Sequence, residues 1–315
     1  MTITQLQYVL AVAEHQNFTK ASEFCFVTQP TLSMQIQKLE DELSVQIFDR
    51  SKKPIELTEV GKKIVSQAKN IVNESERIQD IIDQDKGFIG GEYTLGVIPT
   101  IMPTLLPMFL KTFTEKHPKV QLKIKELTTP QIIKQLNEGN LDAALAATPL
   151  EDENLIERPL YYEPFVAYVP KAHRLAQHKT ITTADLDIND ILLLEDGHCF
   201  RDGVVNLCSA TKSNKNNTFS LESGSFETLT KLADEGLGMT LLPYLHSKQL
   251  QECYTDSIIH FTDPKPAREV SLLFHKSELK IQITKALKDV IDAVIRGAIA
   301  FHDVKIISPK KIYSN

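Results

Sequence analysis

Cysteine is scarce in this sequence, with four residues in 315. That number is too small for the disulfide framework of a secreted protein, and in a reducing compartment a disulfide is more often transient or sensing than structural. No apolar run approaches the roughly 18 residues that a membrane span needs, and the N-terminus lacks the basic and apolar regions of a signal peptide. These absences predict a cytoplasmic protein with no membrane partner.

Basic residues do not outnumber acidic residues in this sequence. The chain has 35 Lys and Arg residues against 41 Asp and Glu residues, for a net charge of −6. Because most nucleic-acid-binding domains are basic, this balance argues against a nucleic-acid partner unless a small basic footprint is present locally. The hydrophobic fraction of 42% is ordinary for globular proteins, and the length predicts two or three domains.

The first 60 residues have the pattern of a helix-turn-helix. Apolar residues at helical spacing predict a first helix over residues 4–15, and Asn17 or Thr19 can cap a second one. Pro30 suits the first turn of a third helix. The outer face of this third helix is polar near its start, at Gln29, Thr31, Ser33, Gln35 and Gln37.

Polar side chains of this kind can hydrogen-bond base edges and phosphates of DNA. Residues 50–53, Arg-Ser-Lys-Lys, follow the third helix and predict a small wing that touches backbone phosphates. We expect the acidic residues Glu40, Asp41 and Glu42 to point away from DNA. A protein-interaction module of three helices is the alternative that the pattern leaves open. Cys25 is interpreted as a small core residue.

Residues 58–90 predict a linker helix, capped by Thr58 and ended by glycines. We expect its apolar seam to join two copies of the chain, because one helix-turn-helix reads only half of a two-fold DNA site. Packing within one chain is the alternative. The seam is a heptad pattern, with Ile64, Ile71 and Ile78 at one position and Ala68, Ser75 and Ile82 at the complementary one.

Residues 91–300 alternate between strand-like and helix-like segments, which predicts α/β units with a mostly parallel sheet. The series restarts near Phe165, and residues 270–274 look like a late strand of the first series. This order predicts two lobes, lobe I at about 91–163 and 268–300 and lobe II at about 164–267. The tail, residues 301–315, carries no recognisable motif.

Ligands of such sheets bind beyond the carboxyl ends of the strands. Thr100 follows the first predicted strand, and Thr128 and Thr129 follow the second. These three residues are therefore candidates for a site in the cleft between the lobes. Taken singly, each threonine is more often a helix cap or a turn residue.

Residues 195–208 hold two of the four cysteines, after a strand predicted at 191–194. His198 and Arg201 lie within a turn of Cys199, Gly197 permits close backbone approach, and a helix is expected to start near Cys199. We expect these effects to lower the pKa of the Cys199 thiol. A sulfenic acid formed there by peroxide condenses readily with a nearby thiol, for which Cys208 is the candidate.

The spacing of these two cysteines adds a constraint. If residues 199–208 are helical, nine residues at about 1.5 Å each separate them by roughly 13 Å, whereas a disulfide needs Cα atoms within about 7 Å. The bond then forms only if residues 200–207 refold. Gly203 would ease this refolding, and the polar stretch 212–217 could accommodate the rearrangement. Two ordinary core cysteines are the alternative. Metal binding is disfavoured because no C-x-x-C or H-x-x-x-H pair is present there, and Cys253 is interpreted as incidental.

Several of these motifs, in this order and spacing, resemble LysR-type transcriptional regulators. They are Phe18-Thr-Lys-Ala-Ser-Glu, Thr28-Gln-Pro-Thr-Leu-Ser-Met-Gln-Ile-Gln-Lys-Leu-Glu, Phe48-Asp-Arg, Leu57-Thr-Glu-Val-Gly61, Ser225-Phe-Glu-Thr-Leu-Thr and Glu235-Gly-Leu-Gly-Met-Thr-Leu-Leu-Pro243. The resemblance implies an α/β protein with a winged helix-turn-helix (1–60), a linker helix (58–90) and a two-lobed, periplasmic-binding-protein-like regulatory domain (91–300). It implies that the third helix enters the major groove, and that the residues facing DNA are Thr28, Gln29, Pro30, Thr31, Ser33, Gln37 and Arg50.

Residues 194–202 together with Cys208 are similar to the redox segment of the hydrogen-peroxide sensors of that family. The likeness implies a peroxidatic Cys199 and a resolving Cys208, whose reversible disulfide activates oxidative-stress defence genes without a cofactor. It implies double-stranded promoter DNA, RNA polymerase and a thiol reductant such as a glutaredoxin or thioredoxin as partners, and a homotetramer built as a dimer of dimers. The implied peroxide site consists of Thr100, Thr129, His198, Arg201 and Asp202.

Two other functions fit parts of the sequence. A metabolite-responsive regulator of the LysR type would bind a small molecule near Thr100 and Thr129 and would not need Cys208. A thiol peroxidase would use Cys199 but has no use for residues 1–60. We therefore expect a peroxide-responsive regulator and not an enzyme.

Overall fold

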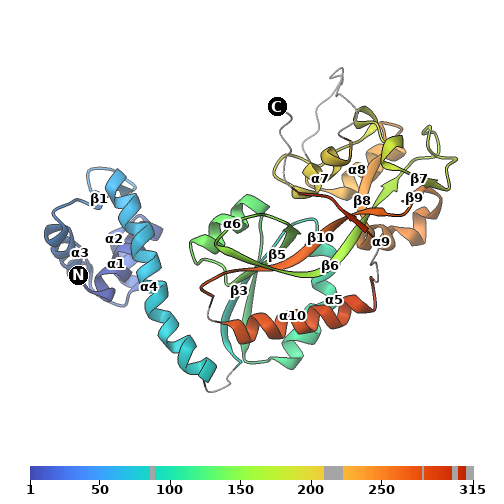
Figure 1. Cartoon of the computed structure of the whole chain (residues 1–315). Helices are drawn as coiled ribbons and strands as arrows, with labels where there is room; N and C mark the ends of the chain where they lie inside the picture. Colours follow the sequence, from blue (N-terminus) through green and yellow to red (C-terminus); the bar gives the residue numbers. More distant parts are fainter. Residues whose placement is uncertain (86–88, 209–222, 279, 300–303, 310–315) are drawn as a thin grey trace. The chain divides into compact units, whose positions relative to one another are not determined.

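The computed structural model describes residues 1–85, 89–208, 223–278, 280–299 and 304–309. It divides into two compact units, residues 1–88 and 89–315 (Figure 1). The polar stretch 212–217 and a strand predicted at 218–221 fall outside the described residues. In the parts of the chain that are described, no helix has the length and apolar character to cross a membrane.

The first unit is a helix-turn-helix followed by a short hairpin and a long helix. Asn17 Oδ1 accepts hydrogen bonds from the backbone N–H groups of Thr19 and Lys20, and Thr58 Oγ1 accepts one from Gly61, so both predicted caps are present. The buried core includes Leu6, Leu32 and Ile36. Its elements are α1 (Ile3–His15), α2 (Phe18–Phe24), α3 (Gln29–Leu43), β1 (Phe48–Asp49), β2 (Glu56–Leu57) and α4 (Glu59–Asp85).

Helix α4 uses its apolar seam in two different ways. Near its start, Ala68 is buried in the core of its own unit, and Ile64 and Ile71 pack against that core. Ala68 is therefore covered within its own chain, as the alternative of packing within one chain expects, whereas Ile64 and Ile71 are only partly buried and their part in a seam between two copies stays a prediction. Further along, Ile78 and Ile82 are exposed by 62% and 41%. The part of the seam that is most exposed is thus the later half of the helix.

The second unit is a mixed sheet with helices on its faces. Figure 1 shows β6 and β10 as long strands that run from one half of this unit to the other. Its elements are β3 (Gly91–Val97), α5 (Met102–Lys116), β4 (Val120–Glu126), α6 (Thr129–Asn137), β5 (Ala143–Thr148), β6 (Leu155–Tyr168), β7 (Thr180–Ile181), η1 (Thr183–Asp185), η2 (Ile188–Asp190), α7 (Cys199–Leu207), α8 (Phe226–Asp234), β8 (Thr240–Pro243), α9 (Tyr244–Tyr254), η3 (Thr255–Ser257), β9 (Ile258–Phe261), β10 (Lys265–His275), α10 (Ile281–Arg296) and β11 (Val304–Ile306).

The prediction of a mostly parallel sheet was wrong in a specific way. Strands β3, β4 and β5 are parallel, but β10 pairs antiparallel with both β5 and β6. The reason is the path of the chain, which leaves the first half along β6 and returns along β10. Residues 191–194 also form no named strand, since only a bridge joins Ile191 to Met239.

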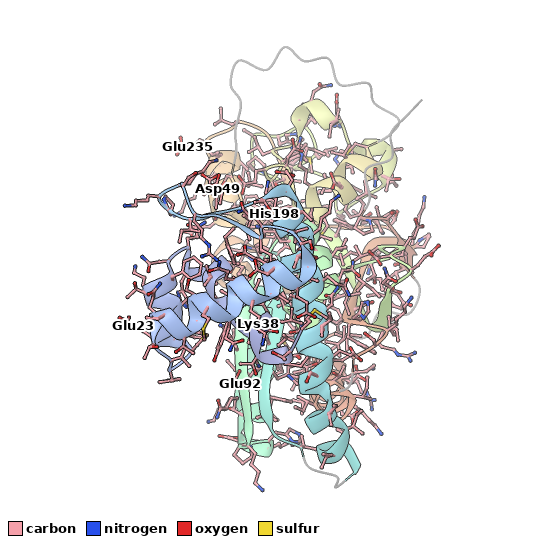
Figure 2. All side chains as sticks on the ribbon, turned by 90° about the vertical axis from the view of Figure 1, so that its left-hand side faces the viewer. Glu23, Lys38, Asp49, Glu92, His198 and Glu235 are labelled. Atoms are coloured by element: carbon pink, nitrogen blue, oxygen red, sulfur yellow. The ribbon has the colours of Figure 1, made fainter. Side chains whose placement is uncertain are left out.

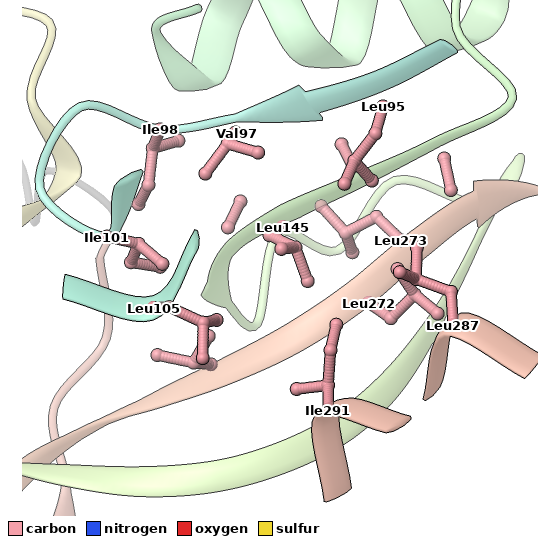
Figure 3. Packing of buried hydrophobic residues seen from close by; sticks show 14 of the residues in the cluster. Leu95, Val97, Ile98, Ile101, Leu105, Leu145, Leu272, Leu273, Leu287 and Ile291 are labelled. Carbon is pink, nitrogen blue, oxygen red and sulfur yellow. The ribbon is translucent and has the colours of Figure 1, made fainter. Parts of the chain in front are cut away.

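Each half of the second unit has its own hydrophobic core. The first, called here the lobe I core, contains Leu95, Leu145 and Leu287, and Figure 3 shows strand and helix side chains interleaved in it. The other, called the lobe II core, contains Phe165, Phe226 and Met239. Strand β6 contributes Tyr161 to the lobe I core and Phe165 to the lobe II core, and at the start of α7 Cys199 belongs to the lobe I core and Phe200 to the lobe II core.

Candidate functional site

Helix α7 carries the two candidate redox cysteines at its two ends. Gly197 has a φ of +96°, a left-handed conformation that a side chain rarely adopts, and it turns the chain into the helix. His198 is the N-cap, Cys199 is the first helical residue and Cys208 is the C-cap. The predicted helix start is confirmed. At about 1.5 Å per residue, this helix keeps the cysteines too far apart for a disulfide.

The two thiols are buried in different cores. Cys199 is 6% exposed and belongs to the lobe I core, whereas Cys208 is 3% exposed and belongs to the lobe II core. Both are free cysteines. A bond between them therefore requires that α7 unwind and that at least one thiol leave its core.

Burial dominates the acidity of Cys199. It raises the pKa of the thiol above its ordinary value of 9.0, while the Arg268 guanidinium, the Thr129 hydroxyl and the Ala147 backbone each lower it in part. The expectation that the local sequence lowers this pKa was wrong, because it ignored the cost of burying a thiolate. The cation that favours the thiolate is Arg268, from β10.

The charged neighbours of Cys199 in the sequence are engaged elsewhere. Arg201 donates to Asp196 Oδ1 at 2.9 Å and to the Leu194 carbonyl at 3.0 Å. His198, labelled in Figure 2, is 6% exposed, and its Nε2 lies 3.4 Å from Glu195 Oε1. Asp202 acts against ionisation of Cys199, since its negative charge raises the pKa of the thiol. These residues brace the start of α7, and their role in peroxide binding remains a prediction.

Arg268 is the residue that sequence reasoning missed. It is 3% exposed and donates to Glu163 Oε2 at 2.7 and 3.0 Å, to Thr100 Oγ1 at 2.8 Å and to the Thr100 carbonyl at 3.1 Å. Its guanidinium also stands over the Phe200 ring, 5.2 Å from the ring centre. A buried Glu163–Arg268 pair thus joins β6, β10, Thr100 and α7. The sequence carries no distinct signal for this pair, because β6 also carries Glu157 and Arg158 and β10 also carries Lys265 and Glu269.

The three candidate threonines have different roles in the structure. Thr128 is half-buried and forms a capping box with Gln131 at the start of α6. Thr129 is buried and acts on the Cys199 thiol, but no residue in the described ranges forms a well-aligned hydrogen bond with its Oγ1. Thr100 is fixed by Arg268. The structure therefore brings Thr100, Thr129 and Cys199 together around Arg268.

Cys208 lacks the nearby cation that Cys199 has. Burial, with a smaller contribution from Asp187, raises its pKa to about 12, and no cation is among the causes. Because the thiolate is the form that attacks a peroxide, Cys199 is the thiol that the structure favours for the first oxidation.

On the first unit, the start of α3 presents an exposed polar surface. Thr28 is the N-cap, and its Oγ1 lies 2.8 Å from Thr31 Oγ1. Gln35 is turned inward, because Gln5 of α1 donates to its side chain at 3.3 Å and to its carbonyl. Met34 is 61% exposed and was overlooked by the sequence reasoning. The exposed residues are Gln29, Pro30, Thr31, Met34, Gln37 and Lys38, with Ser33 partly exposed; Figure 2 labels Lys38.

Arg50 braces the hairpin in this structure. It donates to Glu40 Oε2 at 2.8 Å and stands over the Phe18 ring at 5.2 Å. Glu40 is 7% exposed and also accepts from the backbone N–H groups of Ile47 and Phe48. Its buried carboxylate therefore holds the wing, and the expectation that it points away from DNA stays a prediction. A DNA contact by Arg50 remains a prediction.

The other two cysteines add little. Cys25 packs against the core of the first unit but is only partly buried, and burial raises its pKa. Cys253 falls within α9, where its side chain is outside the described set.

Comparison with known families identifies the class of protein. Residues 3–62 match the model of the lysR family of bacterial regulatory helix-turn-helix proteins, and residues 86–296 match the LysR substrate binding domain. The second match alone spans more than half of the chain. The chain therefore belongs to the LysR family of regulators.

Within that family, the chain is similar to proteins named for hydrogen peroxide. It is 35% identical to the hydrogen peroxide-inducible genes activator of Dickeya chrysanthemi, covering 87% of this chain and 89% of the relative. It is 34% identical, with the same coverage, to the DNA-binding transcriptional dual regulator OxyR of Escherichia coli K12.

Solved structures agree with this likeness. A full-length OxyR of Pseudomonas aeruginosa with a cysteine-to-aspartate change matches with a TM-score of 0.76 and 33% identity, covering 92% of this chain and 94% of that one. A hydrogen-peroxide-bound cysteine-to-serine mutant of Corynebacterium glutamicum OxyR matches with a TM-score of 0.63 and 27% identity, covering 94% and 93%.

Proposed function

We propose that this chain is a DNA-binding transcriptional regulator that senses hydrogen peroxide through Cys199 and Cys208 and activates oxidative-stress defence genes. The observation that carries the proposal is the placement of two free thiols at opposite ends of α7 and in different cores. The relatives named for hydrogen peroxide share the fold over most of the chain.

The chemistry takes two steps. The Cys199 thiolate attacks one oxygen of hydrogen peroxide, the O–O bond breaks, and hydroxide leaves as Cys199 becomes a sulfenic acid. Cys208 then attacks the sulfenic sulfur, a disulfide forms, and the sulfenic oxygen leaves as water. Thr129 Oγ1, buried without a well-aligned partner among the described residues, is a donor for the peroxide. Thr100, His198, Arg201 and Asp202 complete the proposed site.

The signal is the backbone change that the disulfide imposes. Unwinding α7 removes Phe200 from its place between Arg268 and Phe226, whose ring it meets edge-on at 5.0 Å. The refolded segment then alters how the regulatory units of two copies associate. We propose a tetramer, as a dimer of dimers, in which this change moves the DNA-binding units and their contact with RNA polymerase.

At the DNA, α3 enters the major groove. Thr28, Gln29, Pro30, Thr31, Ser33 and Gln37 contact it, with Arg50 beside them on the wing. The exposed later half of α4 carries the apolar residues that pair two copies. A thiol reductant such as a glutaredoxin or thioredoxin resets the switch by reducing the disulfide.

The test combines DNA footprinting with mass spectrometry. A binding site is first selected from a random DNA pool, and the reduced and peroxide-treated proteins are then footprinted on it. In the wild type, we expect peroxide to alter the footprint and to form a Cys199–Cys208 disulfide. In Cys208→Ser, we expect peroxide to form a sulfenic acid on Cys199 but no disulfide and no altered footprint. A wild-type footprint and thiol state that are indifferent to peroxide would refute the proposal.

A further inference from the structure

The C-terminal strand lies beside the redox helix. Strand β11 pairs in parallel with the first residues of β10, Lys265 to Ala267. The Ile307 N–H continues the pairing with a 2.8 Å hydrogen bond to the Ala267 carbonyl. Ile307 is 9% exposed and belongs to the lobe II core, which also contains Leu207 and Cys208. The tail, which has no motif in the sequence, is therefore part of the structure around the resolving cysteine.

A hydrogen bond links this tail to the last turn of α7. The side-chain amide of Asn206 donates to the Ser308 carbonyl at 2.9 Å. Asn206 stands two residues before Cys208, within the segment that has to unwind before the two thiols can meet. Disulfide formation therefore has to break the Asn206–Ser308 bond and disturb the apolar cluster around Ile307.

We propose that residues 304–309 form a clasp that holds α7 helical in the reduced protein and sets the rate of disulfide formation. The proposal rests on the proposed function, in which hydrogen peroxide supplies the oxidising equivalents. The clasp acts on the second step alone, in which the thiol of Cys208 attacks the sulfenic sulfur of Cys199 and water leaves.

The first step is independent of the clasp for a structural reason. Cys199 lies in the lobe I core, and Arg268, Thr129 and the Ala147 backbone act on its thiol. Arg268 is itself held by Glu163 and Thr100. No residue of 304–309 is among these groups, so loosening the tail leaves the first thiol in its place.

Three variants loosen the clasp in different ways: deletion of residues 304–315, Ile307→Ala and Asn206→Ser. Serine has nearly the helix propensity of asparagine, but its short side chain cannot reach Ser308. The control is Val205→Ala, a change of an exposed neighbour on the same turn that raises helix propensity. It is expected to leave the second step unchanged or slower.

The measurement is rapid-quench oxidation by hydrogen peroxide, with sulfenic acid trapped by a dimedone reagent and free thiols alkylated before mass spectrometry. We expect Cys199 sulfenic acid to form within about two-fold of the wild-type rate in every variant. Disulfide formation accelerates by about five-fold in Asn206→Ser, the factor by which one net hydrogen bond shifts an opening equilibrium. It accelerates further in the deletion.

An unchanged or slower second step in all three variants overturns the clasp. A deletion that slows the first step, while both point variants behave as wild type, also overturns it, since the tail would then only support the fold. A wild-type protein that forms no disulfide overturns the proposed function and the clasp together. If the wild type and all three variants form the disulfide at the same rate, the clasp is overturned and the proposed function stands.

Discussion

The buried guanidinium of Arg268 offers the sharpest test of how the Cys199 site works. It donates to both Glu163 and Thr100, and it is the cation that lowers the pKa of Cys199 against the effect of burial. We expect Arg268→Met to impair the protein in two separable ways. One is a loss of stability, and the other is a loss of reactivity toward peroxide.

The loss of stability comes from the charge that is left behind. The Glu163 side chain is 0% exposed, and without Arg268 its carboxylate keeps the backbone N–H of Leu245 as a partner. Breaking a buried ion pair by removing one partner costs about 3–5 kcal/mol, and we expect the free energy of unfolding to fall by about that much. The double variant Arg268→Met with Glu163→Gln has no unpaired charge and recovers most of this loss.

The loss of reactivity comes from the thiol. A nearby opposite charge lowers a pKa by about 1–3 units, so its removal raises the pKa of Cys199 further. The thiolate fraction at neutral pH then falls about ten-fold for each unit by which the pKa rises. On a logarithmic scale, the higher nucleophilicity of the more basic thiolate offsets a little less than half of this loss in rate. The net effect is a first oxidation about four- to forty-fold slower at neutral pH. The double variant keeps this deficit because it still lacks the cation.

The assay pairs chemical denaturation with stopped-flow oxidation over a range of pH, and thiolate absorbance follows the ionisation of Cys199 directly. The expected signature is a double variant with restored stability and a slow, alkaline-shifted reaction. If the double variant regains the wild-type rate together with its stability, Arg268 supports the fold and does not act on the thiol.

The remaining predictions concern each unit in turn. Burial raises the pKa of Cys199, so its oxidation rate in the wild type rises with pH through the neutral range and past 9.0; a plateau at lower pH would contradict this. Cys208→Ser accumulates the sulfenic acid at the wild-type rate, whereas Cys199→Ser resists peroxide at neutral pH, because the pKa of Cys208 is about 12; mass spectrometry distinguishes the two. Gln37→Ala weakens specific DNA binding by about 1–3 kcal/mol if it reads a base, while the inward-facing Gln35→Ala leaves base preference unchanged in the same binding titration. Ile78→Glu on the exposed half of α4 dissociates dimers in sedimentation without lowering the melting temperature of the folded chain; a dimer of wild-type affinity would exclude that seam.

Features that depend on nearby residues could be predicted from the sequence. The caps at Asn17 and Thr58 and the start of α7 at Cys199 follow from side chains within three residues of each helix start, and the structure has all of them. The same locality limits what the sequence says about α4. A heptad pattern shows that one face is apolar, but Ala68 packs on α1 and Ile78 does not, and only the tertiary arrangement decides between them.

The Cys199 site depended on distant residues and was predicted only in part. Arg268 lies 168 positions from Thr100 and 105 from Glu163 along the chain, so no local spacing could place them together. Burial has the same origin, which is why the direction of the Cys199 pKa was missed although the residue was found. Both thiols are made less acidic by burial, and only Cys199 has a cation that offsets the effect. Arg268 on β10 is therefore the feature that distinguishes the surroundings of the two buried thiols.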